Sequence, residues 1–122
     1  MKDFQEGAKL AAKLSYEAKK ENDKESYKFY RYLFCKRRYL AIRSRYYECR
    51  DKHCSEQVWN LIECKAKATI RLLADKVPGC DDLLVMLHLY SSHSCLNNRK
   101  LISAERDVEE ALDLLTDFTV NE

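Results

Sequence analysis

The chain of 122 residues contains only two glycines and one proline. Hairpin turns and phosphate-binding loops depend on these residues, so their scarcity disfavours a β-rich fold and a nucleotide-binding loop. The longest nearly apolar run covers residues 83–90, which is too short to cross a bilayer. There is no Asn-x-Ser/Thr sequon, and the first ten residues lack the apolar core of a signal peptide. We therefore expect an intracellular protein, cytoplasmic or nuclear, with no membrane partner.

Motifs that identify an enzyme are also missing from the sequence. There is no zinc-protease helix, no nucleophile elbow and no pair of carboxylates in an apolar context. Cys54 directly follows His53, but adjacent residues on a helix do not face one another, so this pair does not indicate a nucleophile with its base. We expect no enzymatic activity and no cofactor.

Residues 26–52 form the most distinctive stretch and predict one long helix. Six residues recur at intervals of three or four along it: Tyr32, Cys35, Tyr39, Ile42, Tyr46 and Cys49. A second apolar stripe begins on the opposite side with Tyr27, Tyr30, Leu33 and Phe34. A helix that is apolar on two opposite faces is expected to lie between other helices.

The remaining segments predict four more helices. A first covers roughly residues 4–18, a third follows Ser55 and ends near Val77, a fourth begins at Asp81 or Asp82, and a fifth begins at residue 101. Residues 92–100 are expected to form a loop, and a buried strand is an alternative for residues 83–90. The prediction is an all-α fold: a single domain over residues 1–122, with about five helices around the long second one.

Charge is distributed unevenly along the chain. Residues 26–52 contain nine Lys or Arg and two acidic residues, a net charge of +7, whereas residues 101–122 have a net charge of −6. The basic residues of the long helix form two rows with a spacing of seven: Arg31, Arg38 and Arg45 in one, and Lys36, Arg43 and Arg50 in the other. The acidic fifth helix is expected either to neutralise one row or to leave both available to a partner.

Tyr and Arg are the residue types enriched at energetically dominant contacts between proteins. The two basic rows, together with Tyr32, Tyr39 and Tyr46, therefore predict a partner-binding surface. We expect an interaction or scaffold module that binds an acidic or amphipathic helical segment of another protein. Nucleic-acid binding through the same rows is the alternative, and self-association is compatible with both. The rows would also serve simply to solvate the edges of a buried helix.

Six cysteines are an even number, which in a secreted chain would suggest three disulfides. Cys35 and Cys49 lie on the apolar stripe, where a thiol behaves as a small hydrophobic group, so we expect mainly free thiols. Cys54 and Cys64 are separated by nine residues and resemble one half of the twin CX9C pattern of small helical-hairpin proteins of the mitochondrial intermembrane space. The second half of that pattern is missing.

A metal site is the other hypothesis for the cysteines. Cys49, His53 and Cys54 are expected at the tip of a helical hairpin, and His93 and Cys95 in another loop. Zinc takes four such ligands in a tetrahedron, so a site would form if the two segments met, although the spacings are not those of common zinc knuckles. A small zinc- or disulfide-stabilised helical protein is therefore a third possibility. His88, inside the apolar run, is expected to bond a backbone carbonyl in the core.

Overall fold

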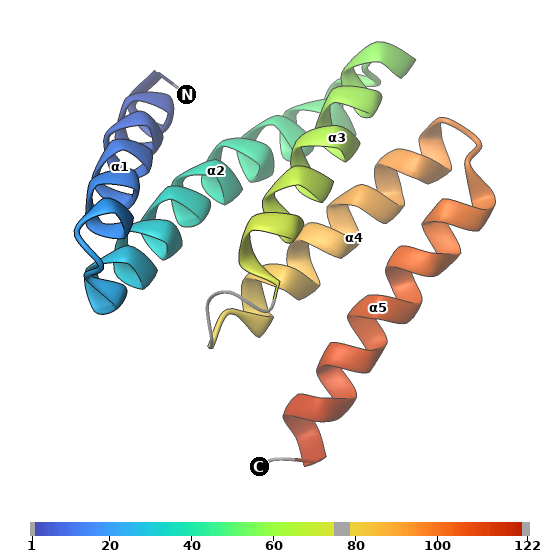
Figure 1. The fold of residues 1–122 in the computed structure, drawn as a ribbon. Coiled ribbons are helices and arrows are strands. Elements are labelled where there is room, and N and C mark those ends of the chain that lie inside the picture. Colours follow the sequence, from blue (N-terminus) through green and yellow to red (C-terminus); the bar gives the residue numbers. More distant parts are fainter. Residues whose placement is uncertain (1, 75–78, 121–122) are drawn as a thin grey trace.

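The computed structural model describes residues 2–74 and 79–120, with side chains described for residues 6–74 and 79–116. Five helices follow one another: α1 (Lys2–Lys20), α2 (Lys24–Lys52), α3 (Glu56–Leu73), α4 (Asp81–Asn97) and α5 (Leu101–Val120). These described ranges contain no strand, so the alternative of a strand over residues 83–90 is wrong. The prediction of an all-α bundle of five helices is confirmed (Figure 1).

Each helix packs against its neighbour in the sequence. α1 lies on α2, α3 on α2 and α4, and α5 on α4, while α2 and α4 also touch (Figure 1). Among the described helices, α5 packs closely on α4 alone. The long α2 therefore organises α1, α3 and α4, as expected, but not α5. The acidic fifth helix does not lie along either basic row of α2.

Local sequence sets both ends of α2. The carboxylate of Asp23 accepts a hydrogen bond from the Ser26 backbone nitrogen at 3.1 Å, which satisfies one of the unpaired donors of the first turn. At the other end His53 adopts a left-handed conformation, with φ of 53°, and stops the helix. Ser55 then opens α3 in an extended conformation. These signals produce the expected hairpin between α2 and α3.

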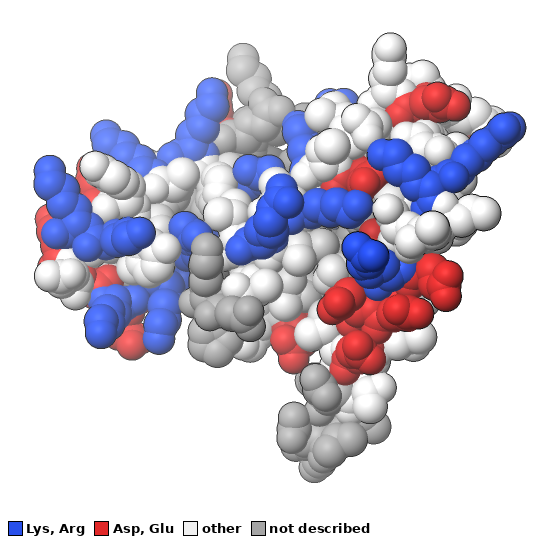
Figure 2. Space-filling view, turned by 45° about the vertical axis from the view of Figure 1, so that its right-hand side comes forward, with Lys and Arg blue, Asp and Glu red and all other residues white. Residues whose placement is uncertain are grey.

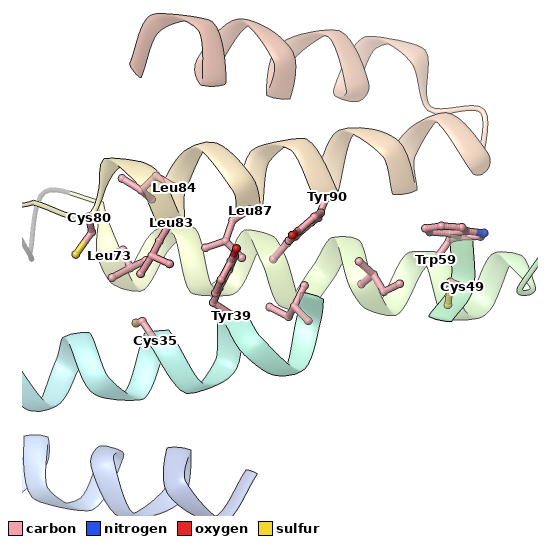
Figure 3. Packing of buried hydrophobic residues seen from close by; sticks show 13 residues of the cluster. Cys35, Tyr39, Cys49, Trp59, Leu73, Cys80, Leu83, Leu84, Leu87 and Tyr90 are labelled. Atoms are coloured by element: carbon pink, nitrogen blue, oxygen red, sulfur yellow. The ribbon is translucent and has the colours of Figure 1, made fainter. Parts of the chain in front are cut away.

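The hydrophobic core lies between α2, α3 and α4 (Figure 3). α2 contributes four residues of the predicted apolar stripe: Cys35, Tyr39, Ile42 and Cys49. α3 and α4 face them with Trp59, Ile62, Ala66, Leu73, Leu83, Leu84, Leu87 and Tyr90. The stripe predicted from spacing is therefore the core-facing side of α2 over its central part.

The two outer helices attach through small residues. α1 buries Ala8, Ala11 and Ala18, and a methyl group at Gly7 would come within 3.2 Å of the Arg37 Nε atom on α2. α5 meets α4 in the same way, through the alanines at positions 104 and 111. Small side chains allow close approach of helices but bury little apolar area. Several larger apolar residues stay exposed, among them Leu10 and Tyr16 on α1 and Leu101 and Leu112 on α5.

The segment 92–100, predicted as a loop, is helical as far as Asn97. Its serines are buried yet satisfied, because the Ser94 hydroxyl donates to the Tyr90 carbonyl oxygen at 2.8 Å and the Ser92 hydroxyl donates to the Ala104 carbonyl oxygen at 3.0 Å. Serine is disfavoured in helix interiors mainly because its hydroxyl competes with the backbone for hydrogen bonds. Here the two hydroxyls bond carbonyl oxygens of α4 and α5, and the helix continues.

One smaller expectation changes, and another lies outside the described residues. The His88 Nδ1 atom lies 3.0 Å from the Asp107 carboxylate on α5, a partner other than the expected backbone carbonyl. α3 ends at Leu73, and the predicted extension towards Val77 falls on residues 75–78, which lie outside the described residues.

A buried carboxylate links α3 to the turn before α5. Glu63 is bonded by the Lys67 Nζ atom at 2.7 Å and by the Lys100 Nζ atom at 3.0 Å. Burial by itself raises the pKa of Glu63, but the two ammonium groups outweigh it and hold the pKa below its ordinary value of 4.5.

We expect Ile42→Ala to lower the free energy of unfolding by about 2–5 kcal/mol, because it leaves a cavity in the middle of the core. Ile42 is 3% exposed. Chemical denaturation measures the change. Lys28→Ala, at an exposed position of the same helix, is the control and is expected to change stability by less than about 0.5 kcal/mol. Equal effects of the two substitutions would show that the stripe is not buried.

The ion pairs of Glu63 predict a specific pH dependence of stability. Because the pKa of Glu63 is lower in the folded chain than in the unfolded chain, its contribution is present above about pH 4.5 and is lost as the pH falls through the lowered pKa. Glu63→Gln is therefore expected to flatten the acid side of the stability curve, measured by urea unfolding at several pH values. Glu17→Gln, at an exposed position, is the control and is expected to leave the curve unchanged.

Candidate interaction surface on α2

One of the two basic rows on α2 faces α3. The Arg31 Nε atom donates to the Leu72 carbonyl oxygen at 3.3 Å, in the last turn of α3, where the helix dipole favours a cation. The Arg38 Nε atom donates to the Thr69 hydroxyl oxygen at 3.1 Å. Arg31, Arg38 and Arg45 are all half-buried. This row therefore takes part in holding α2 against α3.

The other basic row lies on the side of α2 that no helix covers. Arg43 and Arg50 are exposed and Lys36 is half-buried. Phe29 and Tyr32 are exposed on this side, and Tyr47 lies at its edge, half-buried, with its ring centroid 6.3 Å from that of Tyr90 on α4. We call the set the exposed α2 face: Phe29, Tyr32, Lys36, Arg43, Tyr47 and Arg50.

Cations and aromatic rings are already in contact on the exposed α2 face. The guanidinium carbon of Arg50 lies 4.7 Å from the Tyr47 ring centroid, and that of Arg43 lies 5.8 Å from it. Such contacts at exposed sites stabilise by about 0.5–1 kcal/mol each. Arg50 also meets Asp51 at 3.2 Å, but both side chains are exposed and this pair contributes little.

The three tyrosines predicted to bind a partner differ in exposure and in their contacts. Tyr32 is 36% exposed and belongs to the exposed α2 face. Tyr39 is buried and stacks on Tyr90, with ring centroids 6.2 Å apart. Tyr46 is half-buried, and its hydroxyl shares a hydrogen bond of 2.6 Å with the His93 Nδ1 atom. Tyr39 and Tyr46 are therefore packing residues, and their prediction as surface contacts is not supported.

Sequence reasoning missed two aromatic residues of the surface, Phe29 and Tyr47. Phe29 is 59% exposed, which is unusual for a residue of its size. It lies seven residues before Lys36, so continuing the spacing of that basic row by one step would have identified it. Tyr47 lies four residues after Arg43, on the same side of the helix.

The metal-ligand candidates are partly brought together. Cys49, His53, Cys54 and His93 line one pocket of about 250 Å³ beside Trp59. Cys95 is buried elsewhere, and the described residues contain no group of three His, Cys, Asp or Glu side chains placed to hold a metal ion.

The chemistry of Cys49 also disfavours a ligand role. Burial, followed by the hydrogen bond with Cys54, raises the pKa of the Cys49 thiol to about 12. Metals bind the thiolate, so a metal ion would have to displace the proton that this environment retains. The zinc hypothesis stays a prediction. Cys54 and Cys64, the half CX9C pair, are both free thiols.

The cysteines are expected to differ strongly in reactivity. Cys64 is exposed, whereas burial raises the pKa of Cys35 and of Cys95 to about 11 and that of Cys49 to about 12. Brief alkylation of the native protein is therefore expected to label Cys64 at least about tenfold faster than these three. Peptide mapping by mass spectrometry measures the labelling, and denatured protein is the control in which the difference disappears. Labelling of Cys49 as fast as Cys64 would contradict the buried environment.

The exposed α2 face thus combines large aromatic rings and cations on one uncovered side of a long helix. Within the described part of the chain, no helix is long and apolar enough to cross a membrane. No protein-family model matches this chain, and no curated protein or solved structure does.

Proposed function

We propose that this chain is a protein-interaction module whose exposed α2 face binds an acidic, amphipathic helical segment. The observation that carries the proposal is Phe29, 59% exposed, on the same side of α2 as Lys36 and Arg43. Neither cation forms an ion pair with another described residue. An uncovered aromatic ring beside unpaired cations offers a partner both apolar contact and charge.

The shape of the face favours a helix as the bound element. From Phe29 to Arg50 the face runs along one straight helix for about 32 Å, at 1.5 Å per residue. A second helix laid beside it presents residues at intervals of three, four and seven, which are the intervals between the aromatic and basic residues of the face. A stripe of leucines flanked by Glu or Asp would therefore meet both kinds of side chain along its length.

A different cluster favours the second candidate, nucleic-acid binding. Arg38, Arg45 and Lys65 lie in the groove between α2 and α3, and the pKa of Lys65 is lowered by burial and then by the two arginines. Three cations that repel one another would be stabilised by a polyanion. This cluster is half-buried, however, and Arg38 is already bonded to Thr69, so the exposed α2 face is the better surface for a partner.

We expect reversal of the exposed row, Lys36→Glu/Arg43→Glu/Arg50→Glu, to weaken binding of an acidic helix by tenfold or more, which corresponds to about 1.4 kcal/mol. The probe is a synthetic helical peptide with leucines at intervals of three and four flanked by glutamates, and binding is measured by fluorescence anisotropy. The matched control, Lys9→Glu/Lys13→Glu/Lys20→Glu, changes the net charge equally at exposed positions of α1 and should change affinity by less than about threefold.

The row that faces α3 is expected to behave differently. Arg31→Glu/Arg38→Glu/Arg45→Glu should lower the free energy of unfolding by about 1–3 kcal/mol, because it removes hydrogen bonds to α3. Reversal of the exposed row should lower it by less, because that row forms no hydrogen bond to α3. If the α1 control weakens peptide binding as much as reversal of the exposed row, the proposal is wrong. Binding to a DNA duplex that falls steeply with salt, without peptide binding, would replace it with the second candidate.

A further inference from the structure

The helix α5 is itself an acidic amphipathic helix with an uncovered apolar stripe. Leu101, Val108 and Leu112 are 66%, 37% and 55% exposed, and their spacing of seven and four places them on one side of the helix. Three exposed acidic residues run beside this stripe: Glu105, Glu109 and Asp113. In Figure 2 the red acidic atoms of the face shown gather mainly where α5 runs.

The contact with α4 uses a different side of α5. Asp107 is buried there, accepting a hydrogen bond from the Ser91 hydroxyl at 2.7 Å, and the Ala104 carbonyl oxygen accepts one from Ser92 at 3.0 Å. These bonds fix how α5 is turned on α4. The apolar stripe is therefore held outward by the bonds on the other side.

α4 extends this apolar surface. Leu89 and Leu96 are 40% and 51% exposed, and they lie three residues before and four residues after Ser92. Since the Ser92 hydroxyl reaches α5, the two leucines lie on α4 close to that helix. We call the combined surface the α4–α5 face: Leu89, Leu96, Leu101, Val108 and Leu112, with Glu105, Glu109 and Asp113 at its edge.

The α4–α5 face has the chemistry that the exposed α2 face requires of a partner, but the two do not meet within one chain. α5 packs on α4, and the described residues of α2 and α5 are not in close contact. α1 and α2 lie at one side of the row of helices and α5 at the other (Figure 1). The acidic helix of one molecule is therefore available only to the basic face of another.

We infer that the exposed α2 face binds the α4–α5 face of a second copy of this chain. This inference rests on the proposed function of the exposed α2 face and names its partner. Phe29 and Tyr32 contact the exposed leucines, while Lys36, Arg43 and Arg50 meet the acidic edge. Opposite charges fix the pairing, because two α2 faces or two α5 helices would repel each other.

Such a contact is heterologous: it joins two different surfaces, so two copies do not satisfy both surfaces of each other. After two copies bind, one α2 face and one α4–α5 face are still unoccupied, and further copies add until a ring closes or an open chain forms. A discrete symmetric dimer is not expected. This property makes the inference testable with variants in which only one of the two surfaces is disabled.

The experiment compares two variants, alone and mixed. Phe29→Ser/Lys36→Ser/Arg43→Ser disables the α2 face, and Leu101→Ser/Val108→Ser/Leu112→Ser disables the α4–α5 face; all these positions are exposed except the half-buried Lys36. Sedimentation velocity from about 10 μM to about 1 mM, where weak interfaces dissociate, is expected to show a rising average mass for the unmodified chain and a single-chain mass for each variant. An equimolar mixture is expected to form a heterodimer of two chains, because it contains one intact surface of each kind.

The matched control is Leu10→Ser/Tyr16→Ser, which removes exposed apolar groups of α1 and should leave assembly unchanged. If the unmodified chain stays a single chain at every concentration but binds the synthetic acidic peptide, the self-association is wrong and the proposed function stands. If it binds neither, both are wrong. Assembly that the α1 control abolishes, or a mixture that gives no heterodimer, would also overturn the inference, and circular dichroism confirms that every variant is folded.

Discussion

The long helix α2 is packed on two opposite sides, and this constraint decides which of its side chains are available to a partner. The core of α3 and α4 takes one apolar side, and α1 takes the other through alanines and a glycine. The arginines at 31 and 38 are used to bond α3. What remains is one uncovered side, where seven-residue spacing brings cations and aromatic rings together. The surface is therefore a by-product of how the helix is buried.

Hydrophobic periodicity predicted which side of α2 faces the core, because this pattern depends only on where residues lie around a single helix. The spacing of Cys35, Tyr39 and Ile42 identified the core-facing side of α2, whereas the helix begins at Lys24, two residues before the predicted start. Helix partners were not predictable in the same way. The position of α5 depends on the buried Asp107 and its bonds to Ser91 and His88, and no one-dimensional pattern reveals such contacts between helices.

The sequence predicted both basic rows and Tyr32 as the candidate site, but it did not show that one row would face α3 or that Phe29 would be exposed. Arg and Lys are costly to bury unpaired, so the row at 31, 38 and 45 is half-buried where Arg31 and Arg38 find acceptors on α3, and Arg43 and Arg50 of the other row stay exposed. Tyrosine has no such restriction: Tyr39 is buried, Tyr46 bonds His93, and Tyr32 reaches solvent. The environment of each tyrosine depends on the neighbouring helices. The spacing of residues along α2 alone therefore could not show which of the three tyrosines would be exposed.

The separation of charge between α2 and α5 has a physical consequence for association. A net charge of +7 on residues 26–52 and of −6 on residues 101–122 would attract strongly in contact, yet the two helices do not pack together. At physiological ionic strength, interactions between exposed charges are screened beyond about 8 Å. The opposite charges of α2 and α5 therefore attract strongly only when the two helices are in contact. Since they do not touch within one chain, that contact requires a second molecule. The small net charge of +2 for the whole chain removes the long-range repulsion that would otherwise keep copies apart.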